Sequence, residues 1–246
     1  MTWNAVLPTL LGIGLLVAVT AGVLGARRVP GWYAPGLAVL RAAAQLALLG
    51  LVLSSVIEHL AWVWAALGVM LVAAVLTAAG RLHADRRSLL WLGLIMLLGA
   101  GTTLAVVLLT GAVTAAPQNV LAVGGIVIGN TMSIATLTGR RFRADVVERR
   151  HEVEGWLALG ATPRQSTLEL ARRAVREALV PSVDQTRTTG MVVLPGAFVG
   201  AVFAGASPLE AGRFQLVVLA GILTAGSLVA VGLAEVLGRA RTVPTE

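Results

Sequence analysis

The chain has 246 residues, of which 57% are hydrophobic and only 13% are charged. A soluble domain carries about 25% charged residues, so this composition excludes a water-soluble globular protein. The formal net charge is +7 and every basic charge is Arg; because these residues follow the predicted loops instead of forming one basic domain, they do not indicate nucleic-acid binding. Cys is absent, which excludes disulfides and thiol chemistry.

Uncharged stretches long enough to cross a bilayer recur along the chain. Residues 1–26 carry no charge, and residues 88–139 form another uncharged run. A bilayer core takes about 20 apolar residues per helix, so the second run holds two spans, divided near Pro117. The sequence predicts an all-α, polytopic helical membrane protein with about seven transmembrane helices. The predicted spans are residues 5–26, 36–57, 61–80, 89–113, 119–139, 188–205 and 214–236.

The Arg residues follow alternate predicted loops, after the first, third, fifth and seventh spans. Positive residues favour the cytoplasmic side, which places the N-terminus outside and the C-terminus in the cytoplasm, in the cell (inner or plasma) membrane. The sixth span is the weakest, because it is short and interrupted by Leu194-Pro195-Gly196. A re-entrant segment is the alternative interpretation there.

The longest charged stretch, residues 140–187, is predicted to be cytoplasmic and to hold two helices. The first helix runs over residues 141–159 and ends at Gly160, a typical residue just beyond a helix C-terminus. Thr162 and Pro163 then suit an N-cap and a first helical position, and the second helix runs to Leu179. The apolar stripe of the first helix comprises Phe142, Val146, Val153 and Leu157, and that of the second comprises Leu168, Ala171, Val175, Ala178 and Leu179.

Two interpretations of this segment stay open. An Arg-rich amphipathic helix can lie on the anionic lipid of the bilayer, which fits the second helix. A short helix that ends in Gly between two spans also suits docking to a cytoplasmic motor subunit, which fits the first. In both cases Pro181 is expected to end the second helix.

Polar residues inside the predicted spans are candidates for a substrate pathway, because polar groups in a bilayer usually face the bundle interior. Arg41 and Gln45, four residues apart, share one helix face; snorkelling of Arg41 to the headgroups is the alternative. Polar groups in the fifth span either line a pathway or hold helices together. The candidates beyond Arg41 and Gln45 are Asn130, Thr131, Met132 and Gln215. Pro195 and Gly196 are candidate hinge residues, a static kink being the alternative.

The chain resembles the FetB-like family of bacterial ABC-transporter permeases, and the resemblance extends nearly end to end. The matching pieces are Arg41–Leu46, Gly99–Ala105, Gly129–Met132, Leu157–Gln165, Ala178–Asp184, Leu194–Gly196, Ala204–Pro208 and Phe214–Gln215. The family is implicated in iron export and metal homeostasis, and its plant relatives in aluminium tolerance. This sequence departs from the family pattern after Leu194-Pro195-Gly196, where Ala197, Phe198 and Val199 replace the usual Met residues; that weakens any thioether metal site here.

The resemblance implies a single transmembrane permease domain, residues 1–246, whose cytoplasmic segment receives a separate ABC ATPase subunit near residues 152–165. That subunit would bind ATP and Mg, leaving no cofactor in this chain, and a second copy of the permease is expected because ABC ATPases work in pairs. The implied coupling residues are Glu154, Trp156, Leu157, Leu159, Gly160, Ala161 and Thr162.

Other functions are weighed against this one. The sequence has no Walker A motif, and His59, His83 and His151 have no second ligand at metal spacing, so we expect no enzyme. An ion-gradient-driven carrier needs acidic groups in mid-membrane, and only Glu235 comes close. A non-transporting partner of an ABC ATPase normally has a large outer domain, whereas the predicted outer loops are short. The predicted spans hold no carboxylate or His cluster suited to a bare cation, so a chelate or a sugar-nucleotide-like anion stays open as substrate.

Overall fold

The computed structural model describes residues 3–239, without the side chains of residues 3–6 and 54–55. In this part of the chain the regular structure is α-helical, apart from one isolated bridge between Thr189 and Val193. The predicted all-α class is therefore confirmed. The helices are α1 (Trp3–Ala26), α2 (Ala34–Val56), α3 (Leu60–Arg81), α4 (Arg86–Leu109), α5 (Pro117–Glu148), α6 (Arg150–Ala158), α7 (Pro163–Thr188), α8 (Gly196–Phe203) and α9 (Pro208–Gly238).

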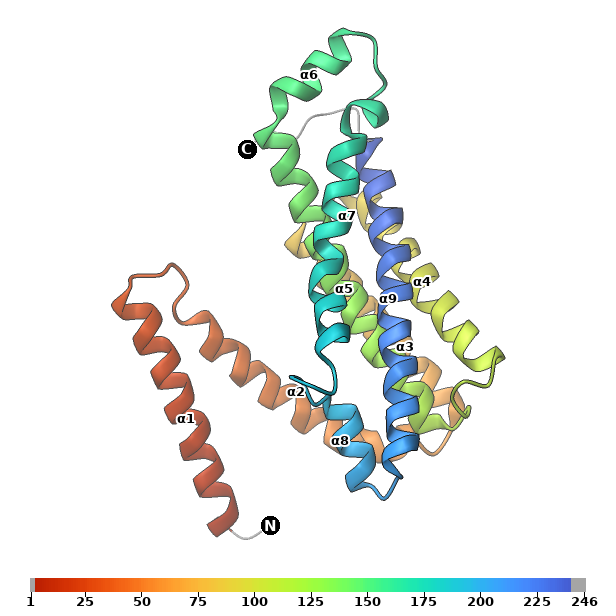
Figure 1. The fold of residues 1–246 in the computed structure, drawn as a ribbon. Helices are drawn as coiled ribbons and strands as arrows, with labels where there is room; N and C mark the ends of the chain where they lie inside the picture. The colour runs from red at the N-terminus through yellow and green to blue at the C-terminus, as the bar shows by residue number, and fades with distance from the viewer. Residues whose placement is uncertain (1–2, 240–246) are drawn as a thin grey trace. The chain divides into compact units, whose positions relative to one another are not determined.

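The chain divides into two units, which we call unit 1 (Met1–Glu58) and unit 2 (His59–Glu246). Unit 1 is a hairpin of α1 and α2, which pack against each other (Figure 1). The two helices approach closely at Gly36, where a Cβ atom would lie 3.2 Å from Cγ1 of Val17. Both helices are apolar along their length and expose their described large side chains within this unit, as expected of helices whose surroundings are lipid or protein.

Unit 2 is a bundle in which α5 and α9 run side by side in the same direction, because Gly221 of α9 packs on Val127 of α5 and Gly226, further along α9, packs on Ile134, further along α5. α3 also runs parallel to α5, because Gly124 packs on Leu67 near one end and Gly139 packs on Leu82 near the other. The glycines allow these backbones to approach closely, as is usual between membrane helices.

The other two long helices of unit 2 run in the opposite direction. Gly99 of α4 packs on Val229 of α9. Thr167, near the start of α7, donates a hydrogen bond to the backbone carbonyl of Gly238, at the end of α9 (3.4 Å). The ends of α3, α5 and α9 therefore meet the starts of α4 and α7, and we call this end of unit 2 the Arg-rich end (Figure 1). It holds most of the unit 2 Arg residues that the sequence places in the cytoplasm, but not Arg187, which lies in the last turn of α7.

Six helices in the described residues are long and apolar enough to cross a membrane: α1, α2, α3, α4, α5 and α9. The chain is thus a multi-pass membrane protein. The prediction of a spanning helix over residues 188–205 is wrong, because α8 has only eight residues and is about 12 Å long, far short of the roughly 30 Å hydrocarbon core.

The crossing at this point is shared between α7 and α8. α7 starts at the Arg-rich end, whereas α9 starts at the opposite end of unit 2, and α8 packs beside α9 before it (Figure 1). The segment between Pro163 and Ser207 therefore passes from one end of the bundle to the other, which preserves the predicted parity of crossings and does not fit a re-entrant loop.

Two predicted helix boundaries are also wrong. The first cytoplasmic helix is not separate, since α5 continues from the membrane to Glu148 and α6 begins after a break at Arg149 (φ −106°, ψ 30°). α7 does not end at Pro181 but runs on to Thr188. Packing of α7 against α5 and α9 compensates for the hydrogen bond that proline removes.

Candidate coupling site and membrane polar groups

The turn between α6 and α7 has a defined backbone structure. Gly160 adopts φ +91°, a conformation that L side chains rarely adopt. Its N–H donates to the carbonyl of Leu157 (3.0 Å), and the N–H of Ala161 donates to the carbonyl of Trp156 (3.0 Å). These two bonds form a Schellman motif. The prediction that Gly160 lies just beyond the helix is confirmed, with α6 ending at Ala158.

The start of α7 is fixed by a capping box. The N–H of Gln165 donates to Oγ1 of Thr162 (3.3 Å), and the N–H of Thr162 donates to Oε1 of Gln165 (2.9 Å). Pro163 follows Thr162 as the first helical residue, where its missing N–H costs nothing. The predicted N-cap is confirmed, and the turn is held on both sides by hydrogen bonds.

The predicted apolar stripe anchors α6 to the bundle. Val153 of α6 is buried in one cluster with Phe142 and Val146 of α5 and with Leu170 and Ala174 of α7. The partly buried side chain of Leu157 packs on the same cluster. Burial of a large aliphatic side chain contributes about 1.5–3 kcal/mol, so α6 is not a free flap but is seated on α5 and α7.

The C-terminal end of α6 and the residue that follows it expose large apolar side chains. Leu159 is 83% exposed and Trp156 is 53% exposed. Glu154 lies one turn from Arg150 and accepts a hydrogen bond from its Nε (2.7 Å); this bond holds the pKa of Glu154 below its ordinary value, so the carboxylate stays charged at neutral pH. The turn therefore presents an apolar tip with a charged pair beside it.

A cluster of charged residues, not foreseen in the sequence, joins α5 to α7 near the seat of α6. Asp145 is fully buried. Its Oδ1 lies 3.3 Å from Nε of Arg141, and its Oδ2 lies 4.0 Å from Nε of Arg173. Glu177 completes the cluster, with ion pairs to Arg141 (2.6 Å) and Arg173 (2.9 Å). The four side chains thus tie α5 to α7 on the membrane side of the α6–α7 turn.

Glu235 is engaged at the Arg-rich end. Its Oε1 accepts a hydrogen bond from Nη2 of Arg164 (2.8 Å), which links α9 to α7, and its Oε2 lies 3.7 Å from Nη2 of Arg239. A carboxylate with two Arg partners at the end of a helix acts as a tie between helices.

Polar side chains of α5 mostly bond to their own helix. Nδ2 of Asn130 donates to the carbonyl of Ile126 (2.9 Å), and Oγ1 of Thr131 donates to that of Ile128 (2.8 Å). Thr131 is fully buried, whereas Asn130 and Met132 are half-buried. Asn130 therefore lies at the edge of an exposed face of α5, and Thr131 lies in the packed interior.

The remaining pathway candidates lie elsewhere. Gln215 is buried near the start of α9, and its Oε1 has no hydrogen-bond partner within the described residues. Gln215 is more than two turns from the level of Asn130, given that Gly221 of α9 packs on Val127 of α5. Arg41 and Gln45 lie exposed on α2 of unit 1. Within unit 2, the structure therefore does not bring Asn130 and Gln215 into one site.

Comparison with known proteins decides the family. The model of the uncharacterised protein family UPF0014 matches residues 8–241, nearly the whole chain. The chain belongs to the UPF0014 family. No solved structure matches it.

Relatives of this UPF0014 chain are found in plants and bacteria. It is 35% identical to the UPF0014 membrane protein STAR2 of Oryza sativa subsp. japonica, over 78% of this chain and 68% of the relative. It is 36% identical to the protein ALUMINUM SENSITIVE 3 of Arabidopsis thaliana, over 74% and 67%. It is 38% identical to the probable iron export permease protein FetB of Escherichia coli, over 53% of this chain and 50% of the relative. The resemblance to FetB-like proteins is thus confirmed.

The candidate hinge of this UPF0014 protein lies at a helix break. α7 ends at Thr188, and Pro195 is the N-cap of α8, with Gly196 as its first residue. Gly190 in the intervening turn adopts φ +87°. The sequence predicts a kink within one helix here, whereas in the structure α7 ends and a separate helix, α8, begins. The hinge role of Pro195 and Gly196 stays a prediction.

Sequence reasoning missed the charged cluster around Asp145. The signal was present as two i, i+4 pairs, Arg141 with Asp145 and Arg173 with Glu177, which are typical of exposed helix faces. Only the packing of α5 on α7 turns both pairs toward each other. In the described residues no group of three or more His, Cys, Asp or Glu side chains is arranged to hold a metal ion.

Proposed function

We propose that this chain is the permease subunit of an ATP-binding-cassette exporter, and that a separate cytoplasmic ATPase subunit docks on the α6–α7 turn. The observation that carries the proposal is the contrast between buried and exposed apolar side chains in α6 and the turn that follows it. Val153 is buried against the bundle, whereas Leu159 and Trp156 are exposed on the tip. An exposed apolar tip on a rigidly held turn fits a partner groove, because preorganised apolar anchors dominate binding energy.

The other predicted coupling residues also fit roles in docking the ATPase subunit. Glu154 keeps its charge beside the tip, Leu157 seats the helix, and Gly160, Ala161 and Thr162 fix the turn. Force on the tip would reach α5 and α7 through the Val153 cluster and through the Asp145 charge cluster. ATP and Mg belong to the ATPase subunit in this proposal, and the permease itself performs no catalysis. Because ABC ATPases act in pairs, two copies of the permease are proposed to share one complex.

The proposed substrate is iron or a related metal species, supported by the printed name of the Escherichia coli relative, a probable iron export permease. The name of the Arabidopsis relative refers to aluminium sensitivity, and a metal substrate is consistent with both. Glu235, the acidic residue that the sequence offers to an ion-gradient-driven carrier, is paired with Arg164 and Arg239 and lies at the end of α9, so this residue does not support that alternative.

The docking proposal predicts the effect of a charge at the tip. Leu159→Glu places a carboxylate where an apolar groove must close, which removes an anchor worth about 2 kcal/mol and lowers capture of the co-expressed ATPase by at least about tenfold. Membrane insertion is expected to stay unchanged, since the Leu159 side chain is 83% exposed and has little packing to lose. Val147→Glu, at another exposed apolar side chain of the same segment, is the matched control.

The measurement is the amount of ATPase subunit that co-purifies with the tagged permease from detergent-solubilised membranes. Reduced capture with Leu159→Glu and normal capture with Val147→Glu support docking at the turn. Equal capture by both variants and the unaltered chain would refute it.

A further inference from the structure

The last turns of α7 lie at the depth of the membrane spans, although the sequence places them in the cytoplasm. Ala178 of α7 packs in one cluster with Ile134 of α5. Asp184 is six residues beyond Ala178, and Asn130 is four residues before Ile134. Because α5 and α7 run in opposite directions, Asp184 and Asn130 lie about 9 and 6 Å below this cluster, within one helical turn of each other.

This depth is close to the middle of the bilayer. Asn130 precedes Arg140, the first charged residue after the span, by ten residues. At 1.5 Å per residue it lies about 15 Å inside that boundary, half of the roughly 30 Å hydrocarbon core. Asp184 at the same level is therefore an intramembrane carboxylate, a class of residue that normally marks a substrate or ion path.

Helical periodicity also places the two residues on facing flanks of their helices. Arg141 and Glu177 contact each other across α5 and α7 at 2.6 Å. Asn130 precedes Arg141 by eleven residues, within about 20° of three full turns, and Asp184 follows Glu177 by seven residues, within about 20° of two full turns. Asn130 thus lies on the same face of α5 as Arg141, and Asp184 lies on the same face of α7 as Glu177, but both lie deeper in the membrane.

The Asp184 carboxylate has no ion pair and no hydrogen bond to another described side chain, and it is exposed on the surface of unit 2. Its backbone carbonyl accepts a hydrogen bond from Oγ1 of Thr188 (2.9 Å). Asn130 uses its Nδ2 on Ile126, which leaves the amide oxygen free to accept. An unpartnered carboxylate is costly in lipid, so this face needs water, protein or a cation against it.

We propose that Asp184, with the amide oxygen of Asn130, is the metal-binding point of the translocation path, and that it takes a divalent cation through oxygen ligands. This inference rests on the proposed export function and names the ligands for its substrate. Carboxylate and amide oxygens are suitable ligands for hard and borderline cations. A single carboxylate with one amide is a weak site, and conduction requires sites that release as well as bind.

The rival role for Asp184 is structural pairing with Arg187, three residues further along α7 on its exposed side. Arg187 lies at similar depth but makes no ion pair within 4.0 Å in the described structure. The two roles differ in the effect of removing both charges. If Asp184 and Arg187 form a structural pair, removing both leaves no unpaired charge and should restore transport. If Asp184 is a metal ligand, removing Arg187 as well cannot restore transport.

The test uses the permease–ATPase complex in inside-out vesicles, with ascorbate-reduced Fe²⁺ as the probe and ATP-dependent Fe²⁺ accumulation as the readout. Asp184→Asn is expected to abolish accumulation while capture of the ATPase subunit stays normal, and Asp184→Glu is expected to retain part of it. The double variant Asp184→Asn with Arg187→Gln is expected to stay inactive. Glu169→Gln, which removes an exposed carboxylate from the same helix, is the control with the same change in charge.

Accumulation at the unaltered rate by Asp184→Asn would overturn the inference, and so would recovery of activity in the double variant. Loss of ATPase capture or of thermal stability in Asp184→Asn, without rescue by Asp184→Glu, would make the residue structural and overturn it as well. Failure of the unaltered complex to form or to move Fe²⁺ on ATP addition would instead overturn the proposed function.

Discussion

At the α6–α7 turn, position 160 requires Gly because of its positive φ and not because space is lacking. A Cβ atom added there would meet nothing within 4 Å, yet φ is +91°. The strain of a side chain in this region is about 1–2 kcal/mol, and it would act on the bonds that shape the tip. The sequence alone is enough to identify this residue, because helix termination by Gly and restart by Thr-Pro are local chemistry.

Asp145 depends on its surroundings in a different way. It is a fully buried carboxylate that lies between Arg141 and Arg173, on two helices. Nothing local distinguishes it from the exposed acidic residues nearby, such as Glu148. The packing of α5 against α7 gives it its role, so no pattern of spacing in the sequence predicts its burial.

Removal of this carboxylate is expected to destabilise the Arg-rich end of unit 2. Asp145→Ala leaves Arg141 and Arg173 close together without their shared partner. Breaking a buried pair costs about 3–5 kcal/mol; both Arg side chains are more than a third exposed, which places the expected cost at the low end, about 3 kcal/mol. Thermal unfolding of the detergent-solubilised protein measures it.

Glu169→Gln serves as the comparison for this prediction, because Glu169 pairs with Arg172 at 3.7 Å on the exposed side of α7. An exposed pair contributes about 0–1 kcal/mol, so its melting temperature should hardly change. Similar melting temperatures for Asp145→Ala and Glu169→Gln would show that the buried cluster contributes little to stability.

At the scale of helices, the sequence predicts the long apolar spans well and the charged segment less well. Hydropathy locates the first five predicted spans and the seventh, since long uncharged runs have few other interpretations. It fails at α7, where Pro181 is a local signal for an end that packing overrides. Because Asp184 and Arg187 are charged, the sixth predicted span starts only at residue 188. In the structure the crossing at this point begins earlier, with α7. The break at Arg149 could not be predicted, because no Gly or Pro lies there.

The crossing by α7 and α8 together predicts which side of the membrane its ends occupy. Because the chain has no Cys, single Cys variants carry a unique label. Ala204→Cys, at the end of α8, should react with a membrane-impermeant maleimide on intact cells. Glu152→Cys, at the Arg-rich end, should react only after the cells are permeabilised. Reaction of both residues from the same side would mean that this segment returns without crossing.

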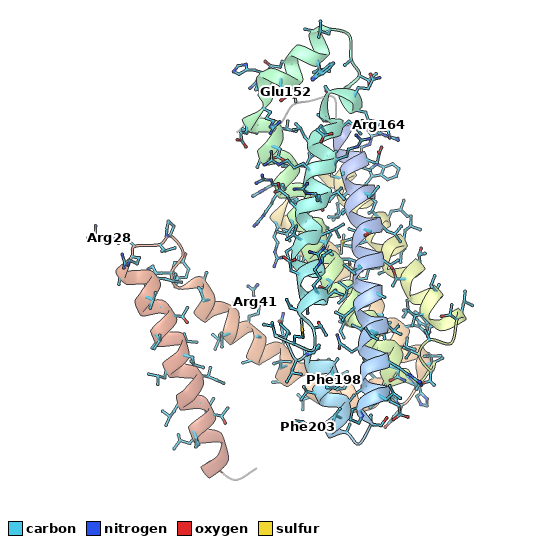
Figure 2. All side chains as sticks on the ribbon, in the orientation of Figure 1. Arg28, Arg41, Glu152, Arg164, Phe198 and Phe203 are labelled. Atoms are coloured by element: carbon cyan, nitrogen blue, oxygen red, sulfur yellow. The ribbon has the colours of Figure 1, made fainter. Side chains whose placement is uncertain are left out.

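At the scale of the molecule, unit 2 separates two kinds of exposed apolar surface. Figure 2 shows Glu152 and Arg164 at the Arg-rich end and Phe198 and Phe203 at the other. Apolar side chains along the spans are expected to meet lipid or other membrane helices. The tip of α6 lies instead among charged residues beyond the spans, where an exposed apolar group marks an interaction site. The sequence predicts this tip from the resemblance to FetB-like permeases, and the structure supplies its orientation.

Photo-crosslinking from the tip in native membranes tests whether the ATPase subunit docks on the α6–α7 turn. A photoreactive amino acid replaces Leu159 in one variant and Phe203, equally exposed at the opposite end of unit 2, in the other. The co-expressed ATPase subunit is expected to be crosslinked from position 159 and not from position 203. Absence of an ATPase adduct at position 159, in membranes where the two subunits co-purify, would contradict docking at the α6–α7 turn.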